Sequence, residues 1–339
     1  HVGDHDIKCH NYKSGGDGTL SVQESIEKSC NVALMLMGKQ IGKSTFLEYQ
    51  EKFNFGLKTN IDLYGESRTS SLVFNTQSMG DTELATSTFG QGYNVTMIQT
   101  IAAFASLING GYYYEPHVVK QVTAPDGSIV ENISPRVLKQ TVSASTSELI
   151  RQYCKGVVDN GTGKTARPAG YSIGGKTGTA ETVPRDKINY VVSFMGYAPA
   201  DNPQIAIYVV VDRPNAVFQD DAKFATRIVR NILTEVLPYM NIYMTEELSD
   251  KEKEELDSLE STITSANTEE EESEMTNEDG LKVNEDGTID AQGGDVTSST
   301  EVTPEEMESD DVLTAPLTGT VLDTSTGEAV REVDVNDPE

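Results

Sequence analysis

Apolar residues recur every three or four positions in the first part of this chain, which is the period of an amphipathic helix. Ser21 begins a capping box with Glu24, and a second box is predicted from Ser145 to Glu148. The segment "NVALMLMGKQIG" is apolar nearly all round, so we expect a buried helix that ends at Gly42. The predicted helices cover residues 21–28, 31–42, 44–53, 96–110 and 145–161.

The pattern then changes to strands. "HVVKQVTAPDGSIVENI" predicts a small hairpin around Pro125-Asp126-Gly127. "YSIGGKTGTAET", "INYVVSFMGYA" and "QIAIYVVVD" follow, and the turn from Pro199 to Pro203 predicts antiparallel pairing of the last two. "DAKFATRIVRNILTEVL" predicts a closing helix. Helices, then an antiparallel sheet, then a covering helix indicate an α+β fold.

Residues after Tyr243 include no aromatic residue, and they contain the acidic run "EEEESE". Such a segment buries too little apolar area to offset the entropy of an ordered chain. We therefore predict a folded domain over 1–243 and an acidic, mostly disordered tail over 244–339, whose first part could continue as an exposed helix.

The net charge of −28 belongs almost entirely to the tail: residues 1–245 carry 22 basic and 23 acidic residues, and residues 246–339 carry 4 and 31. The domain therefore offers no basic patch for nucleic acid. Its cysteines, Cys9, Cys30 and Cys154, lack metal-type spacing, and none of the four histidines forms H-x-x-x-H. We predict no metal and no cofactor.

The stretch "SIEKSCN" contains two candidate catalytic motifs. Ser25 and Lys28 form S-x-x-K and share one face of a helix. Ser29 and Asn31 form S-x-N, with Cys30 between them pointing away from the cleft. Ser25 lies one turn behind Ser29, so we expect it to point along the helix and not to be the nucleophile.

A second motif, "GYSIGGKT", fits two patterns. As G-x-x-x-x-G-K-[ST] it could hold phosphate, but that site needs a preceding strand and a following helix, and the flanking sequence favours neither. As K-T-G on a strand, Lys176 supplies positive charge and Gly178 allows close approach of a peptide-like substrate. The hydroxyls of Thr177 and Thr179 could donate to a carboxylate.

S-x-N followed by K-T-G is part of the signature of penicillin-binding proteins and β-lactamases. The stretches "GTLSVQESIEKSCNVALMLMGKQIG", "FGLKTNIDLYGE", "TFGQGYNVTMIQTIAAFASLINGG", "GGKTGTAE" and "SFMGYAPADNPQIAIYVVVD" resemble the transpeptidase domain of class B penicillin-binding proteins. The division or sporulation types of Gram-positive bacteria are the most similar. The resemblance covers about 70% of the chain and implies the β-lactamase/penicillin-binding-protein transpeptidase fold.

The resemblance also implies roles. Ser29 relays a proton to the leaving amine, and Asn31 holds the acyl-side amide of the substrate. Lys176 lies near Ser29 and attracts the terminal carboxylate, which Thr177 and Thr179 bind beside Gly178. The backbone N–H of Thr179 forms half of the oxyanion hole.

The family's nucleophilic S-x-x-K lies on an earlier helix, so we expect it upstream of this chain and expect the chain alone to be inactive. The implied activity is D,D-transpeptidation of peptidoglycan stem peptides, with β-lactams as inhibitors and other cell-wall synthesis proteins as partners. The implied location is the extracytoplasmic face of the cell membrane, through an N-terminal anchor. A β-lactamase or β-lactam sensor, a non-catalytic envelope scaffold and a nucleotide-binding protein are the alternatives.

Overall fold

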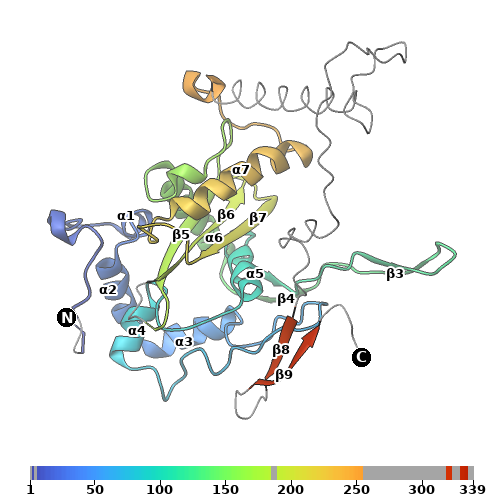
Figure 1. Ribbon diagram of the computed structural model, residues 1–339. Helices are drawn as coiled ribbons and strands as arrows, with labels where there is room; N and C mark the ends of the chain where they lie inside the picture. The colour runs from blue at the N-terminus through green and yellow to red at the C-terminus, as the bar shows by residue number, and fades with distance from the viewer. Residues whose placement is uncertain (1, 4–5, 185–188, 255–317, 323–328, 335–339) are drawn as a thin grey trace, which may run out of the picture. The chain divides into compact units, whose positions relative to one another are not determined.

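The computed structural model describes residues 2–3, 6–184 and 189–254, together with the backbone of 318–322 and 329–334 (Figure 1). The chain divides into two compact units, His1–Ile263 and Thr264–Glu339. The first unit contains all the predicted site residues.

Helices form most of the N-terminal part of the first unit. They are η1 (Tyr12–Ser14), α1 (Val22–Glu27), α2 (Asn31–Ile41), α3 (Lys43–Lys52), α4 (Asp81–Ser87) and α5 (Met97–Ile108). Two short antiparallel ladders follow, made by β1 (Tyr112–Tyr114) with β4 (Val137–Gln140), and by β2 (Gln121–Thr123) with β3 (Ile129–Asn132). The second ladder is the hairpin that the sequence predicts.

The rest of this unit is built on one antiparallel sheet. Its elements are α6 (Ala144–Asp159), η2 (Lys164–Ala166), β5 (Gly174–Glu181), β6 (Tyr190–Ala198), β7 (Ile205–Asp212) and α7 (Lys223–Tyr239). The strand order is β5-β6-β7, so β5 is an edge strand. The predicted pairing of β6 with β7 is confirmed, and with it the α+β fold.

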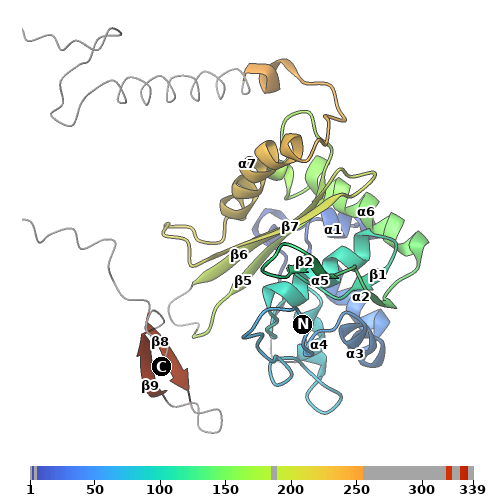
Figure 2. The same ribbon diagram turned by 90° about the vertical axis from the view of Figure 1, so that its right-hand side faces the viewer.

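Both faces of the sheet are covered, with α7 on one side and α5 and α6 on the other (Figure 2). Alternate residues of β6 point to opposite faces. Phe194 therefore packs in the cluster that includes Val229 of α7, whereas Tyr197 packs against Phe104 of α5. This two-sided core fixes the orientation of β5.

Local sequence signals set several helix starts. Ser21 and Glu24 form the predicted capping box of α1, and Thr96 forms one with Gln99 at α5. The box predicted at Ser145 is wrong, because Ser143 caps α6 by accepting the Thr146 N–H. Four hydroxyl residues stand close together there, and the first of them, Ser143, has the extended conformation of a cap.

The predicted helix that ends at Gly42 is confirmed, because α2 has Gly42 as its C-cap, but the prediction that this helix is buried is wrong. In α2 only Gly38 is buried, where it packs closely on Thr88 of the loop after α4, and Leu36 and Ile41 are exposed. Within the described part of the chain, α2 contacts α1, α3 and α4, which cover only part of its circumference. Its apolar composition is therefore not matched by burial.

Close packing of β5 on β6 leads to the first prediction. A Cβ on Gly175 would overlap the Phe194 ring and the Met195 carbonyl of the paired strand. We expect Gly175→Ala to lower the free energy of unfolding by about 3 kcal/mol, because the backbone carbonyl cannot move away. Urea unfolding of the full-length protein measures this change.

Gly127 serves as the control for that variant. It lies at φ 84° in the β2–β3 turn with open space around it, so Gly127→Ala should cost only about 1 kcal/mol. Equal losses in the two variants would contradict the packing argument.

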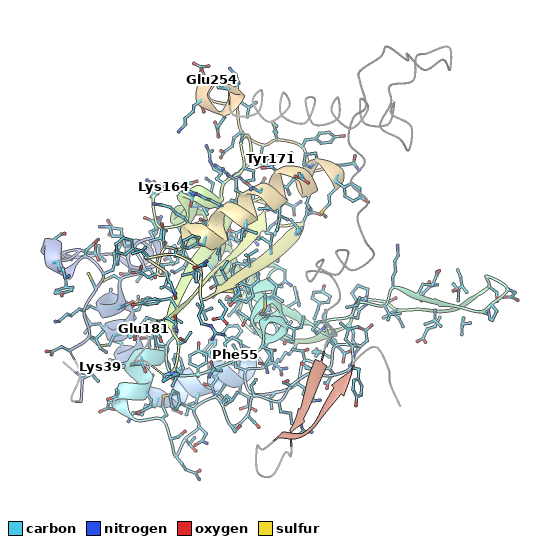
Figure 3. The ribbon with its side chains drawn as sticks, viewed as in Figure 1. Lys39, Phe55, Lys164, Tyr171, Glu181 and Glu254 are labelled. Atoms are coloured by element: carbon cyan, nitrogen blue, oxygen red, sulfur yellow. The ribbon has the colours of Figure 1, made fainter. Side chains whose placement is uncertain are left out.

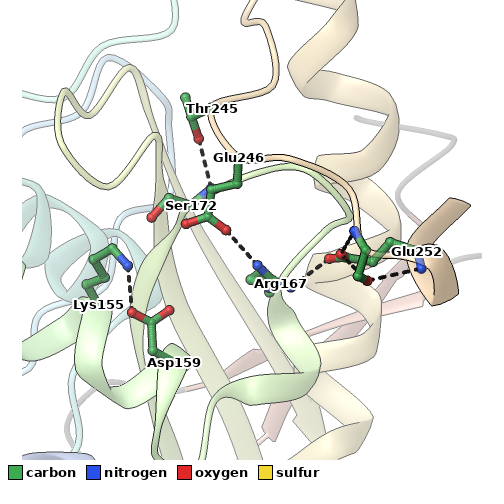
Figure 4. A network of polar contacts seen from close by, with 8 residues as sticks. Lys155, Asp159, Arg167, Ser172, Thr245, Glu246 and Glu252 are labelled. Carbon is green, nitrogen blue, oxygen red and sulfur yellow. Dashed lines mark hydrogen bonds and ion pairs between the residues drawn. The ribbon is translucent and has the colours of Figure 1, made fainter.

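The residues that follow α7 pack against an earlier part of the first unit, the loop between η2 and β5 (Figure 4). Arg167 bridges Glu246 and Glu252 at 2.6 Å each, and the Gly170 carbonyl accepts the Thr245 N–H. Residues 250–254 are helical. The predicted boundary at residue 243 therefore precedes a segment that still contacts the domain.

In the predicted tail, the backbone forms an antiparallel pair, β8 (Thr318–Leu322) with β9 (Ala329–Asp334). Threonine and valine in these segments favour strands, and the prediction of a mostly disordered tail named no strand here. The remainder of that prediction, over 255–317, 323–328 and 335–339, lies outside the described residues. In the parts of the chain that the structure describes, no helix is both long and apolar enough to span a membrane.

Candidate active site

Helix α1 ends in a turn that sets the conformation of Ser29. The Cys30 N–H donates to the Ser25 carbonyl and the Ser29 N–H to the Ile26 carbonyl, which together form a Schellman motif. The residue at the centre of this motif is usually glycine, yet here it is Ser29, at φ 52°. A left-handed serine costs about 1 kcal/mol, and such strain is concentrated at functional sites.

This turn directs the Ser29 hydroxyl towards β5. The Lys176 ammonium donates to Ser29 Oγ at 2.7 Å, across 147 positions of sequence. The same ammonium donates to the Thr177 carbonyl at 2.9 Å. The structure thus brings the serine of S-x-N and the lysine of K-T-G into direct contact.

Lys176 of β5 lies close to Cys154 of α6, which packs against this strand. Burial lowers the pKa of its amine to about 8, and the neighbouring Cys154 opposes this shift. Burial likewise raises the pKa of the Cys154 thiol to about 11, so this cysteine is protonated at neutral pH. The Lys176 amine is therefore mostly charged at neutral pH, with a pKa only about one unit above that pH.

The free edge of β5 presents main-chain groups of Thr177 and Thr179. Gln91 donates its side-chain amide to the Thr179 carbonyl at 3.4 Å, from outside the sheet. In an antiparallel strand the N–H and C=O of one residue point to the same side. The Thr179 N–H therefore also points to the free edge, where a carbonyl oxygen of a bound peptide could accept it.

Gln91 lies between two glycines in left-handed conformations, Gly90 at φ 84° and Gly92 at φ 90°. These conformations bend the loop after α4 so that the side chain of Gln91 reaches β5. Figure 3 shows the side chains of this region, with Lys164 preceding β5 and Glu181 at its end. The sequence gave no role to Gln91, although the Gly90-Gln91-Gly92 stretch resembles a loop of the family.

Asn31 is oriented differently from the expectation. Its side-chain amide donates to the Lys8 carbonyl at 3.4 Å, so the described hydrogen bond points to the N-terminal segment and not to β5. This contact is long and easily exchanged for another acceptor. The assignment of Asn31 to the substrate amide stays a prediction.

The alternative pair, Ser25 and Lys28, does not form a site. Ser25 is buried and donates its hydroxyl to the Ser21 carbonyl at 2.7 Å, within its own helix. Lys28 is exposed. A buried, internally bonded hydroxyl is poorly placed to attack a substrate.

Among the described residues, Cys9, Asp17 and Cys30 form the one group that could hold a metal ion, with ligand atoms within 4.8 Å of one another. The Cys9 thiol donates to Asp17 at 3.2 Å. Burial and this hydrogen bond raise the pKa of Cys9, which opposes the thiolate that a metal requires. Sequence spacing missed this cluster because Cys9 and Cys30 are distant in sequence.

The phosphate-loop alternative is excluded by the secondary structure. Gly174 to Thr177 lie in β5, which continues to Glu181 and pairs with β6 throughout. Thr177 is followed by four more residues of β5 and not by a helix, so the amides of a helix N-terminus are not present there to hold a phosphate.

An antiparallel sheet with S-x-N and K-T-G joined at its edge defines the class of serine acyl-transfer domains that react with penicillins. The chain belongs to the penicillin-binding protein transpeptidase domain family, whose model matches residues 1–234. The predicted family and fold are confirmed.

Similar proteins include stage V sporulation protein D of Bacillus subtilis, whose sequence is 40% identical to this chain over 240 residues. This match covers 70% of the chain and 36% of the relative. Penicillin-binding protein PbpB of Mycolicibacterium smegmatis is 32% identical over 200 residues, which are 55% of the chain and 30% of the relative. The chain thus spans about a third of the length of these relatives.

Solved structures show the same fold. Penicillin-binding protein 3 of Mycobacterium tuberculosis in complex with aztreonam matches with a TM-score of 0.59 at 29% identity, over 67% of this chain and 53% of that one. The same protein in complex with ampicillin gives a TM-score of 0.60, over 67% and 52%. Both are complexes of that protein with a β-lactam.

Proposed function

We propose that the protein containing this chain is a penicillin-binding D,D-transpeptidase that cross-links peptidoglycan stem peptides. The observation that carries the proposal is the 2.7 Å contact between Lys176 and Ser29 beside the free edge of β5. A D-alanyl terminus can lie along this edge as an added strand. Similarity to the sporulation protein favours a role in cell-wall synthesis during spore formation.

In the proposed reaction, a nucleophilic serine attacks the carbonyl of the terminal D-Ala-D-Ala bond. The oxyanion accepts the Thr179 N–H, and one such donor is worth about 10²–10³ in rate. Ser29 passes its proton to the leaving nitrogen as the C–N bond breaks and takes up the proton that the nucleophilic serine gave up, so D-alanine departs and Ser29 is restored. An amine of a neighbouring stem peptide then attacks the acyl-enzyme ester, and the proton that this amine loses returns to the oxygen of the nucleophilic serine as the ester bond breaks.

We assign the binding roles to residues of this site. Lys176 and the hydroxyls of Thr177 and Thr179 hold the terminal carboxylate, and Gly178 leaves room for the substrate backbone. Asn31 binds the acyl-side amide after exchanging the Lys8 carbonyl for it. The nucleophile is the serine of an S-x-x-K motif on a helix that precedes residue 1, and the exposed apolar side of α2, including Leu36, is a surface for such a helix. An N-terminal anchor holds the domain outside the cell membrane, where other cell-wall synthesis proteins are its partners.

A fluorescent penicillin tests this proposal on the full-length protein. We expect a covalent band that survives Ser25→Ala, because Ser25 is buried and bonded within α1. The band should disappear when the serine of the upstream motif is replaced. Loss of the band in Ser25→Ala, in a protein that keeps its melting temperature, would identify Ser25 as the nucleophile.

The alternatives predict other results. Full-length protein that stays folded and takes no label would support the envelope scaffold. Rapid release of the label would indicate a β-lactamase, whereas a transpeptidase keeps it.

A further inference from the structure

One residue that no motif includes lies at the junction of S-x-N and K-T-G. Thr162 follows α6 in the stretch "NGTGK", and its N–H donates to the Glu27 carbonyl at 3.2 Å. Glu27 is the last residue of α1, two positions before Ser29. The backbone of Thr162 is therefore tied to the helix that ends in the Ser29 turn.

Glycines on both sides hold Thr162 in this place. A Cβ on Gly161 would overlap the Glu27 carbonyl, so only glycine allows the loop to approach α1 this closely. Gly163 donates its N–H to the Val157 carbonyl at 2.9 Å, which fixes the loop on the end of α6. The backbone of Thr162 is thus held in place, and its side chain is exposed.

The hydroxyl of Thr162 lies 2.7 Å from the hydroxyl of Thr177. Thr177 and Thr179 point to the same face of β5, because side chains two positions apart in a strand do so. Three hydroxyl groups therefore gather on one face of the strand edge.

The number of protons determines the direction of this hydrogen bond. A hydroxyl has one proton to donate and two lone pairs to accept with. When Thr177 donates its proton to a ligand carboxylate, it cannot also donate to Thr162. The short contact then requires Thr162 to donate to Thr177.

We propose that Thr162 is a positioning residue that holds the Thr177 hydroxyl in the orientation that donates to the ligand carboxylate. The inference rests on the proposed function of the site. Thr162 thereby favours the binding of a ligand with a terminal carboxylate at the edge of β5. Without the donor, the Thr177 proton can turn to other acceptors, among them the oxygen of a water that replaces the lost hydroxyl.

The test compares acylation of the full-length protein by benzylpenicillin and by its methyl ester, which lacks the negative charge. We expect Thr162→Val, which keeps the shape but removes the hydroxyl, to slow acylation by benzylpenicillin about 5- to 10-fold, the effect of one hydrogen bond. Acylation by the ester should change less than twofold in that variant. Thr162→Ser, which restores the donor, should return the rate with benzylpenicillin to near the original value.

Thr165→Val is the matched control. Its hydroxyl makes a similar contact, at 2.6 Å with Thr226, away from β5. This variant should leave the ratio of the two acylation rates unchanged.

Each result has one interpretation. An equal loss with acid and ester in Thr162→Val, or no rescue by serine, would show a structural role and overturn the proposal. Unchanged rates with both ligands would overturn it as well. If the unmodified protein takes no penicillin at all, it is the proposed function that fails, so the two failures are distinguishable.

Discussion

Replacing Ser29 by glycine is expected to slow acyl transfer about 10²–10⁴-fold while making the protein more stable than the corresponding alanine variant. Both changes remove the hydroxyl that contacts Lys176 and relays the proton in the proposed mechanism. Only glycine also relieves the left-handed conformation at φ 52°. We expect the free energy of unfolding of Ser29→Gly to exceed that of Ser29→Ala by about 1 kcal/mol.

Urea unfolding and the rate of cross-linking with a stem peptide measure the two effects separately. Because glycine is the usual residue at the centre of a Schellman motif, the serine here is kept at a cost in stability. Equal stabilities of the two variants would remove the argument that strain is held at this position. A glycine variant with full activity would remove the proton-relay role.

Affinity for a peptide ending in D-alanyl-D-alanine is expected to weaken as the pH rises through about 8, the pKa to which burial lowers the Lys176 amine. Below that pH the ammonium is charged and attracts the terminal carboxylate. Above it the amine is neutral and the attraction is lost. A bound carboxylate favours the charged form, so binding raises the pKa of Lys176 and moves the transition upward.

The control for this pH dependence is the same peptide with a C-terminal amide, which has no charge for Lys176 to attract. Its affinity should stay nearly constant over the same pH range. Lys176→Ala should lower acylation by penicillin about 10²-fold, because a charge-assisted contact and the Ser29 hydrogen bond are both lost. The same pH dependence in the alanine variant would show that another group titrates.

Local sequence signals predicted much of the secondary structure. The capping box at Ser21 and the Pro199 to Pro203 turn depend on neighbours in the chain, and both predictions are confirmed. The errors arose where several neighbouring residues could each cap a helix, or where the burial of a helix depends on another element that packs against it. Ser143 caps α6 in place of Ser145. Helix α2 is only partly buried, because its apolar pattern does not say which side another element covers.

The residues of the candidate site likewise fall into two groups, those that the sequence indicated and those that only the structure revealed. S-x-N and K-T-G are short motifs with fixed spacing, so Ser29, Asn31, Lys176 and Thr177 could be found in the sequence. Thr162 and Gln91 could not, because each contributes through one contact with β5. The glycines beside them were the available signal, and glycine pairs also occur in ordinary loops.

The sequence by itself determined most of the longer helices and strands, the family and the residue types of the site, because these depend on neighbours in the chain. Only the tertiary structure decided that the Ser29 hydroxyl meets the Lys176 ammonium, 147 positions away. It also decided that Ser29 is left-handed, that Asn31 donates to Lys8 and that Thr162 contacts Thr177. The physical reason is that such contacts depend on how α1, α6 and β5 pack, and packing is set by the whole core.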